Sequence, residues 1–205
     1  MALPGKYARI RIMSETSTAF TDESTTADAS LRIYTIDDRD LKYWDREVAV
    51  QVFRNAVLVP TEEYRVQHAG GRIHFWEPQG GGDVITVSGA FVTVVTAAES
   101  NEYTLTNESE IVDVTVFESD GWRERLAGIL SSSGTVSGFW VVNNLFTPRL
   151  LEQKPLILEL QANKDDPEIY AMYVVMETQE LAPSVEGAVE TSVSWQSDGD
   201  LLIEQ

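Results

Sequence analysis

Short runs in which apolar and polar residues alternate follow one another along most of the chain. The clearest are residues 31–36, 48–53, 111–117, 156–160 and 189–195, and residues 84–87 and 91–95 are further β-branched runs. Residues 169–176 are apolar on both faces, as in a central strand or one that a partner covers. Alternation with a period of two is typical of β-strands that bury one face. About a dozen such runs at close spacing predict an all-β fold, mainly an antiparallel sandwich or barrel. We expect a single β domain over residues 1–205.

Residues 64–68 and 72–76 predict a β-hairpin. Gly70 and Gly71 lie between the two runs. Glycine readily adopts the positive φ angles that a tight turn between two strands needs.

One segment has a helical period instead. Within residues 119–130, four large apolar side chains recur at three- and four-residue spacing: Trp122, Leu126, Ile129 and Leu130. A serine and an aspartate before them can cap a helix. We expect one short α-helix here, packed through these four side chains on the outside of the β fold.

Residues 14–30 interrupt the strand pattern with a long polar stretch. The segment is rich in Ser, Thr, Asp and Glu and has almost no aliphatic side chains. Such a composition buries too little apolar surface to offset the entropy of ordering. We therefore expect a flexible polar arm or loop at 14–30.

The charge of the chain disfavours ordinary nucleic-acid binding. The formal net charge is −18, and residues 101–205 carry 19 acidic and 5 basic residues. A surface this negative repels phosphate, and no basic stripe is visible. Nor is any apolar run long enough to span a bilayer, so we expect no membrane contact.

Candidate chemistry is sparse. The chain has no cysteine, which excludes disulfides and thiolate sites. Its two imidazoles, His68 and His74, lie in the predicted hairpin, where a structural role is more typical than a catalytic one. The acidic groups at 165–168 and 198–200 lack the ligand spacing of a calcium loop. We predict no catalytic residues, no cofactor and no metal, and hence no enzyme.

Three stretches together resemble the major tail tube proteins of long-tailed, siphovirus-like bacteriophages. They are residues 114–140, with Gly121-Trp122 at the start of the predicted helix; residues 183–199, with an alternating run that ends at Gly199; and, more loosely, elements between residues 43 and 89. The resemblance implies rings of six subunits that stack into a hollow tube, through which double-stranded DNA passes during ejection. It also implies a virion tail protein made and assembled in the host cytoplasm.

The resemblance gives the acidity a role. Carboxylates that line the lumen would repel DNA, which would then be cargo and not a bound ligand. Candidates for the lining are Asp113, Glu159, Glu177 and Glu190, as outward residues of second-half strands. Candidates for an assembly arm are Ser14, Phe20, Asp22, Glu23 and Ser30.

The implied partners are further copies of the chain, together with the tape measure protein, the tail terminator and the baseplate proteins of the same virion. Two alternatives remain open. One is another tail structural protein, such as a terminator, a distal baseplate hub or a decoration protein. The other is a β-sandwich carbohydrate-binding module, which would need exposed aromatics among Trp44, Trp76 and Trp140.

Overall fold

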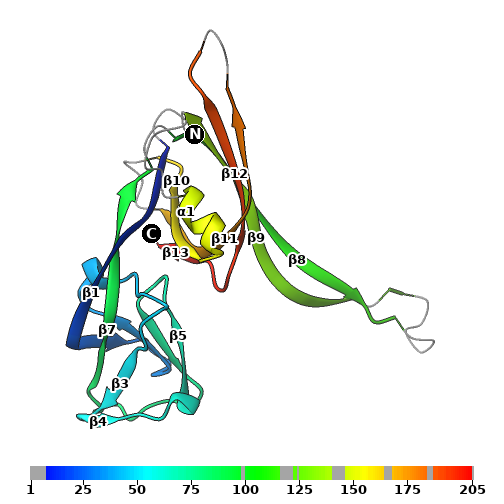
Figure 1. Cartoon of the computed structure of the whole chain (residues 1–205). Coiled ribbons are helices and arrows are strands. Elements are labelled where there is room, and N and C mark those ends of the chain that lie inside the picture. Colours follow the sequence, from blue (N-terminus) through cyan, green and yellow to red (C-terminus); the bar gives the residue numbers. More distant parts are fainter. Residues whose placement is uncertain are drawn as a thin grey trace. The chain divides into compact units, whose positions relative to one another are not determined.

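The computed structural model describes residues 8–97, 100–115, 122–123, 125–139, 146–163, 168–183 and 187–204. These residues form thirteen strands and one α-helix (Figure 1). The strands are β1 (Arg9–Ala27), β2 (Ile33–Ile36), β3 (Gln51–Arg54), β4 (Val57–Leu58), β5 (Tyr64–Gln67), β6 (Arg72–Phe75), β7 (Ile85–Thr96), β8 (Ser100–Asp113), β9 (Arg125–Phe139), β10 (Leu156–Gln161), β11 (Ile169–Ala182), β12 (Glu190–Ser197) and β13 (Leu202–Glu204). The helix is α1 (Phe146–Glu152), and two 3-10 turns lie at Arg39–Leu41 and Thr61–Glu63.

The strand ladders are antiparallel, which confirms the predicted all-β class with a single short helix. The chain divides into two compact units. Unit 1 contains Met1–Ala97, Leu156–Tyr173 and Gly199–Gln205, and unit 2 contains Ala98–Pro155 and Val174–Asp198. Strand β11 therefore contributes its first residues to unit 1 and the rest to unit 2.

Unit 1 contains a sheet and the predicted hairpin. The sheet order is β4-β3-β7-β1-β10-β11, and β13 pairs with the first residues of β11. The hairpin of β5 and β6 forms as the glycines predicted, with Tyr64 opposite Phe75 and Gly71 at a φ of 60°. Strand β2 connects this hairpin to the end of β1.

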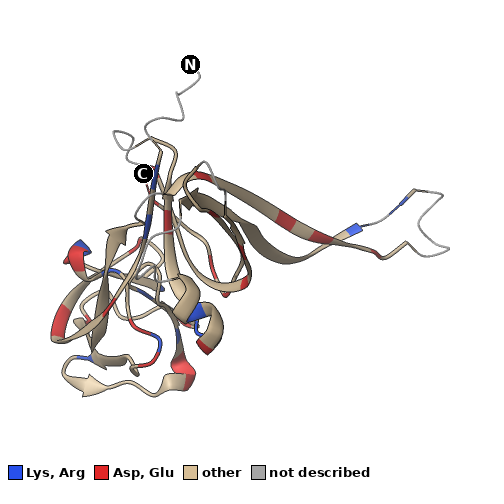
Figure 2. Ribbon diagram, turned by 45° about the horizontal axis from the view of Figure 1, so that its top comes forward, with Lys and Arg blue, Asp and Glu red and all other residues tan. Residues whose placement is uncertain are grey.

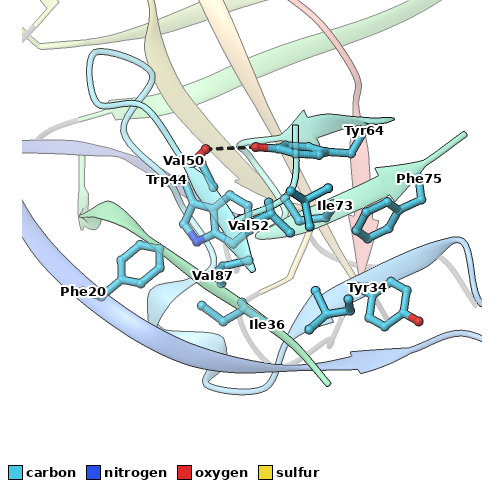
Figure 3. Close-up of a cluster of buried hydrophobic side chains, with 12 residues drawn as sticks. Phe20, Tyr34, Ile36, Trp44, Val50, Val52, Tyr64, Ile73, Phe75 and Val87 are labelled. Carbon is cyan, nitrogen blue, oxygen red and sulfur yellow. Dashed lines mark hydrogen bonds between the residues drawn. The ribbon is translucent and has the colours of Figure 1, made fainter. Parts of the chain in front are cut away.

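The core of unit 1 is aromatic and β-branched. Trp44 and Val52 are fully buried at its centre, and Tyr64 donates a hydrogen bond to the Val50 carbonyl (Figure 3). The ring of Phe75 meets Tyr34 edge-on, which is a favoured geometry for aromatic pairs. Most of this cluster comes from residues 20–75; only Ile85 and Val87 belong to β7.

Residues 14–27 do not form the predicted arm. They continue β1, which pairs with β7 from Arg11 to Ser24 with two register shifts. Phe20 inserts into the core of unit 1, and Asp37 accepts hydrogen bonds from Ser24 and Thr26. The prediction of flexibility was wrong for these residues because neighbouring strands supply the partners that the polar segment lacks in isolation.

Unit 2 contains a four-stranded sheet in the order β11-β12-β9-β8. One face of it is apolar and buried, with Val136 of β9 opposite Val193 of β12. Gly134 lies opposite Trp195, and an added Cβ at Gly134 would come within 2.7 Å of the Trp195 ring. Glycine at position 134 therefore leaves room for the Trp195 ring.

Helix α1 contacts this sheet through a hydrogen bond that Thr147 donates to Gln179 on β11.

Candidate functional site: a polar sheet face and an exposed ribbon

The other face of the unit 2 sheet is mostly polar on all four strands; the apolar residues on it are Phe139 and Ala182, directly opposite Glu190, and Val175, opposite Gln196. Directly paired residues of antiparallel strands share a face. One row therefore runs Glu102–Ser137–Ser192–Glu180, and the next runs Thr104–Thr135–Ser194–Thr178. We call this surface the polar face: the two rows together with Thr106, Glu108, Ser131, Ser133, Glu190 and Gln196, which occupy alternate positions on the same strands.

Every charged side chain on the polar face is a carboxylate. Glu102, Glu108, Glu180 and Glu190 are all exposed, and Glu177 lies beside them at a register shift of β11. Glu102, Glu180 and Glu190 border an open hollow of about 390 Å³. The face can therefore repel an anion over its whole width.

Hydroxyl groups fill the space between these carboxylates and bond to one another across the strands. The Thr104 and Thr135 hydroxyls are 3.0 Å apart, the Thr178 and Ser194 hydroxyls 2.7 Å, and Ser137 donates to Ser192 at 3.2 Å. Such cross-strand pairs hold the side chains close to the sheet. Between the carboxylates, the face therefore consists mainly of short hydroxyl side chains.

Strands β8 and β9 continue past the rest of this sheet as a two-stranded ribbon (Figure 1). The pairing of β9 with β12 ends at Ser133, whereas its pairing with β8 extends to Arg125. The ribbon carries large apolar side chains with 41–80 % exposure: Ile111, Val112, Val114, Trp122, Leu126, Ile129 and Leu130. We call these residues the apolar ribbon. They lie on both faces of the ribbon, since neighbours such as Ile111 and Val112 point to opposite sides, and Val114 and Trp122 lie beyond the strand ends. Exposed apolar surface of this extent is typical of a contact surface for another chain.

The apolar ribbon overturns the predicted packing helix. Leu126, Ile129 and Leu130 lie in strand β9 and are 61–79 % exposed, and Trp122 is 80 % exposed. Residues 119–121 and 124 of the predicted helix lie outside the described part. Helical spacing failed as a signal because Leu126 pairs with Val112 in the strand ladder, which local periodicity does not reveal. Within the described residues, the α-helix of the chain is α1, at Phe146–Glu152.

Glu159 is not an outward residue. Its side chain is 1 % exposed in β10, whose six residues are all buried. Arg11, directly opposite on β1, forms an ion pair with Glu159, and Tyr43 donates a hydrogen bond to it. Burial and the neighbouring Glu159 carboxylate raise the pKa of Tyr43 above its ordinary value, so Tyr43 stays a donor. The alternation that predicted an outward position was wrong, because all six residues of β10 are buried and both of its faces are therefore covered.

The other predicted lining residues have different positions. Glu190 belongs to the polar face, and Glu177 adjoins it. Asp113 lies at the end of β8 on the ribbon, opposite Arg125. Glu102, Glu108 and Glu180 were missed, although residues 102–108 alternate Glu or Thr with Tyr103 and Leu105 and could have shown a half-buried strand.

Catalytic or metal chemistry has no evident location in the described part of the chain. His68 lies edge-on to the Tyr173 ring, and His74 contacts Gln67. Among the described residues, no group of three or more His, Asp and Glu side chains could hold a metal ion. Residues 164–167, which contain Asp165 and Asp166, lie outside the described part. Among the described residues, no helix has the length and hydrophobicity to cross a membrane.

The fold and these surfaces define an antiparallel β protein whose distinctive features are two surfaces, one acidic and one apolar. The model of the family described as phage tail tube protein matches residues 84–202. The chain therefore belongs to the phage tail tube protein family, and it is a structural component of a virion tail.

Two solved structures are similar over about half of the chain. One is a chain from the tail of an empty GTA particle, reconstructed with C6 symmetry: identity is 22 %, the TM-score is 0.48, and the match covers 54 % of this chain and 85 % of that one. The other comes from the virion of a native gene transfer agent (GTA) particle, with 22 % identity, a TM-score of 0.47 and coverage of 54 % and 88 %. Comparison with curated proteins gives no match.

Proposed function

We propose that the chain forms rings of six copies that stack into a hollow tail tube, with the polar face turned toward the lumen. The observation that carries this proposal is the charge of that face, where every ionised group is a carboxylate. Membership in a family of structural tube proteins supports a role in which the chain conducts DNA without chemical catalysis. Glu102, Glu108, Glu177, Glu180 and Glu190 are then the lining residues, and Asp113 and Glu159 are not.

Repulsion is the physical reason for such a lining. Double-stranded DNA carries about one negative charge per 1.7 Å of its axis, so a basic lining would hold it by many phosphate contacts. Carboxylates within the Debye length of about 8 Å at physiological salt push the duplex away from the wall. The short, mutually bonded hydroxyls between them present few long donors to phosphate.

Two features of unit 2 support self-assembly. Strand β8 pairs with β9 alone among the described strands, so its other edge has free backbone groups that a neighbouring copy can pair with. The apolar ribbon supplies the hydrophobic contact surface, in place of residues 14–30. Ser14, Asp22, Glu23 and Ser30 can still contact other subunits from the edge of unit 1, whereas Phe20 is in the core.

The remaining partners follow from the tail context. A tube of this kind ends at a terminator and a baseplate and encloses a tape measure protein during assembly in the host cytoplasm. A carbohydrate-binding role has less support, because Trp44 is fully buried and Trp76, at 52 % exposure, does not form an aromatic platform with it. Trp140 lies outside the described residues.

The lining is tested by removing charge from the polar face. The variant Glu102→Gln/Glu180→Gln/Glu190→Gln should still form tubes, because the substituted side chains are exposed and nearly isosteric. Phage that carry it should eject DNA more slowly, by about tenfold or more, because three carboxylates per copy no longer repel the duplex. Electron microscopy of tubes and single-virion ejection assays are the measurements.

A matched control separates lining from net charge. Glu15→Gln/Glu47→Gln/Glu77→Gln removes the same charge from exposed positions of unit 1. It should leave the ejection rate unchanged. Equal slowing in the two triple variants would assign the effect to net charge and not to the lining, and wild-type ejection rates in both would mean that the acidity serves solubility alone.

A further inference from the structure

Strand β13 is held on unit 1 by a small contact. It pairs with residues 169–171 at the start of β11, and Leu202 is fully buried there. Gly70, at the turn of the β5–β6 hairpin, leaves room for this leucine, since an added Cβ would come within 3.2 Å of it. We call residues 198–204 the arm. The cradle is the surface that receives it: residues 169–171 with Arg39, Lys42 and Gly70.

Ion pairs hold the end of the arm in the cradle. Glu204 pairs with Arg39 and with Lys42, whose Nζ lies 2.5 Å from the carboxylate. Arg39 also donates a hydrogen bond of 3.0 Å to the Gly70 carbonyl oxygen, which fixes its guanidinium beside the hairpin turn. Burial raises the pKa of Glu204, but Lys42 and then Arg39 outweigh burial and lower the pKa below its ordinary value. The carboxylate therefore stays ionised between two bases.

The arm crosses from one compact unit to the other. Strand β12 belongs to unit 2, whereas the chain from Gly199 onward belongs to unit 1. The connection between β12 and β13 is short, exposed from Asp198 to Asp200, and has Gly199 at a φ of 107°. Short hinge connections are where elements exchange between copies of a protein. A strand with one fully buried side chain also opens at little cost.

We propose that in the assembled tube the arm of each copy lies in the cradle of the next copy. This inference rests on the assembly proposed above and names one of its contacts. The occupant is a second copy because exchange reproduces every pairing that the arm makes within one chain, so no new complementarity is needed. Contacts of this heterologous kind repeat from copy to copy and close into a ring or continue as a filament.

The exchanged contact also suits copies that repel one another. Each chain carries a net charge of −18, so an interface gains from any place where an acid meets bases. Glu204 brings its carboxylate to two bases in the cradle. Once other contacts hold two copies side by side, the arm is present at a high effective concentration beside the neighbouring cradle.

The absence of cysteine allows a direct test. Tyr170 lies directly opposite Ile203, a spacing that a disulfide can bridge. The variant Tyr170→Cys/Ile203→Cys is assembled under reducing conditions, the tubes are oxidised, and the denatured chains are separated by size without reductant. Exchange should give a ladder of covalently linked copies, at least about tenfold more abundant than in the control. Oxidised tubes that release only unlinked chains would overturn the proposal.

The matched control is Gln67→Cys/Arg72→Cys. These two residues also lie directly opposite each other, but within the β5–β6 hairpin, whose short turn keeps the partners in one chain. This variant should give unlinked chains alone. An equal ladder from both variants would show random crosslinking between copies and would reject the exchange.

Charge reversal gives a second test. Glu204→Arg alters the arm and Arg39→Glu/Lys42→Glu alters the cradle, so each variant alone should form tubes at a yield reduced by about tenfold or more. An equimolar mixture should restore the yield, because each arm then meets a matching cradle on the other variant. Loss of tubes without rescue in the mixture would place the arm on its own chain. Normal tubes from either variant alone would remove the arm from assembly, and both results overturn the proposal.

The exchange and the proposed function fail separately. Wild-type tubes, together with unlinked chains from Tyr170→Cys/Ile203→Cys, would reject the exchange and leave the tube intact. A wild-type chain that forms no tubes would reject the proposed function. Linked chains from the oxidised cysteine variant would in that case still establish the exchange, and unlinked chains would reject both.

Discussion

At the scale of single residues, Gly134 shows how a missing side chain shapes the sheet of unit 2. Trp195 is 1 % exposed and lies across Gly134, and an added Cβ would also collide with the Thr104 carbonyl oxygen. That oxygen is backbone and cannot rotate away. The buried and polar faces of the sheet therefore both depend on a residue without a side chain.

Gly134→Ala should destabilise the protein by about 2 kcal/mol, because overpacking at a rigid site typically costs about 1–3 kcal/mol. Chemical denaturation monitored by tryptophan fluorescence measures the change. Gly81→Ala is the control, since nothing lies within 4 Å of a Cβ at Gly81. We expect Gly81→Ala to stay within about 0.5 kcal/mol of the wild type. An equal loss in both variants would contradict the packing argument.

His68 predicts a loss of stability in mild acid. Burial, and then the neighbouring Arg46, lower the pKa of His68 from 6.5 to about 4. The unfolded chain therefore takes up a proton below about pH 6.5 that the folded chain takes up only near pH 4, and stability falls as the pH falls through this interval. The loss amounts to roughly 3 kcal/mol at pH 4, since a pKa difference of one corresponds to about 1.36 kcal/mol.

Thermal unfolding of the wild type and His68→Gln across pH 4–7 measures this contribution. The variant should lose less stability than the wild type on acidification, because it has no imidazole to protonate. NMR titration of the His68 ring should give a midpoint well below 6.5. A normal midpoint would show that the ring is solvated.

At the scale of elements, the sequence predicted where strands lie better than it predicted which strands pair with each other. The β5–β6 hairpin formed with its glycine turn because all its information is local. The sequence predicted a helix in place of β9 because Leu126, Ile129 and Leu130 also fit a helical period. Their strand conformation depends on pairing with β8, which is distant in the local pattern. Long-range pairing is the part of sheet structure that a single sequence shows least.

The same limit applies to the candidate site. Glu190 was found on the polar face because Val193 and Trp195 alternate with polar neighbours in a short window. Glu159 was misplaced because alternation within β10 does not show that both of its faces are covered. In β1, the polar residues 14–27 were expected to be flexible because their own composition offers little to order them. The groups that do order them, Asp37 and strand β7, lie elsewhere in the chain.

At the scale of the whole molecule, the negative charge acts on two partners at once. It repels the proposed cargo, and it also repels other copies of the chain. Acidic residues outnumber basic ones on the ribbon diagram (Figure 2), in keeping with 33 Asp and Glu against 15 Lys and Arg. Assembly therefore has to overcome a repulsion that the lining requires.

Because like charges on the copies repel one another, tube formation should become faster as salt is added. The Debye length shortens from about 30 Å at 0.01 M to about 8 Å at 0.15 M salt, so added salt removes most of the repulsion between approaching copies. We expect the rate of tube elongation, followed by light scattering, to rise over this range. The variant Glu102→Gln/Glu180→Gln/Glu190→Gln should assemble faster than the wild type at 0.01 M and show a weaker salt dependence, because each copy carries three fewer charges. A rate that falls with added salt would show instead that ion pairs between copies limit the encounter, and that the net charge does not.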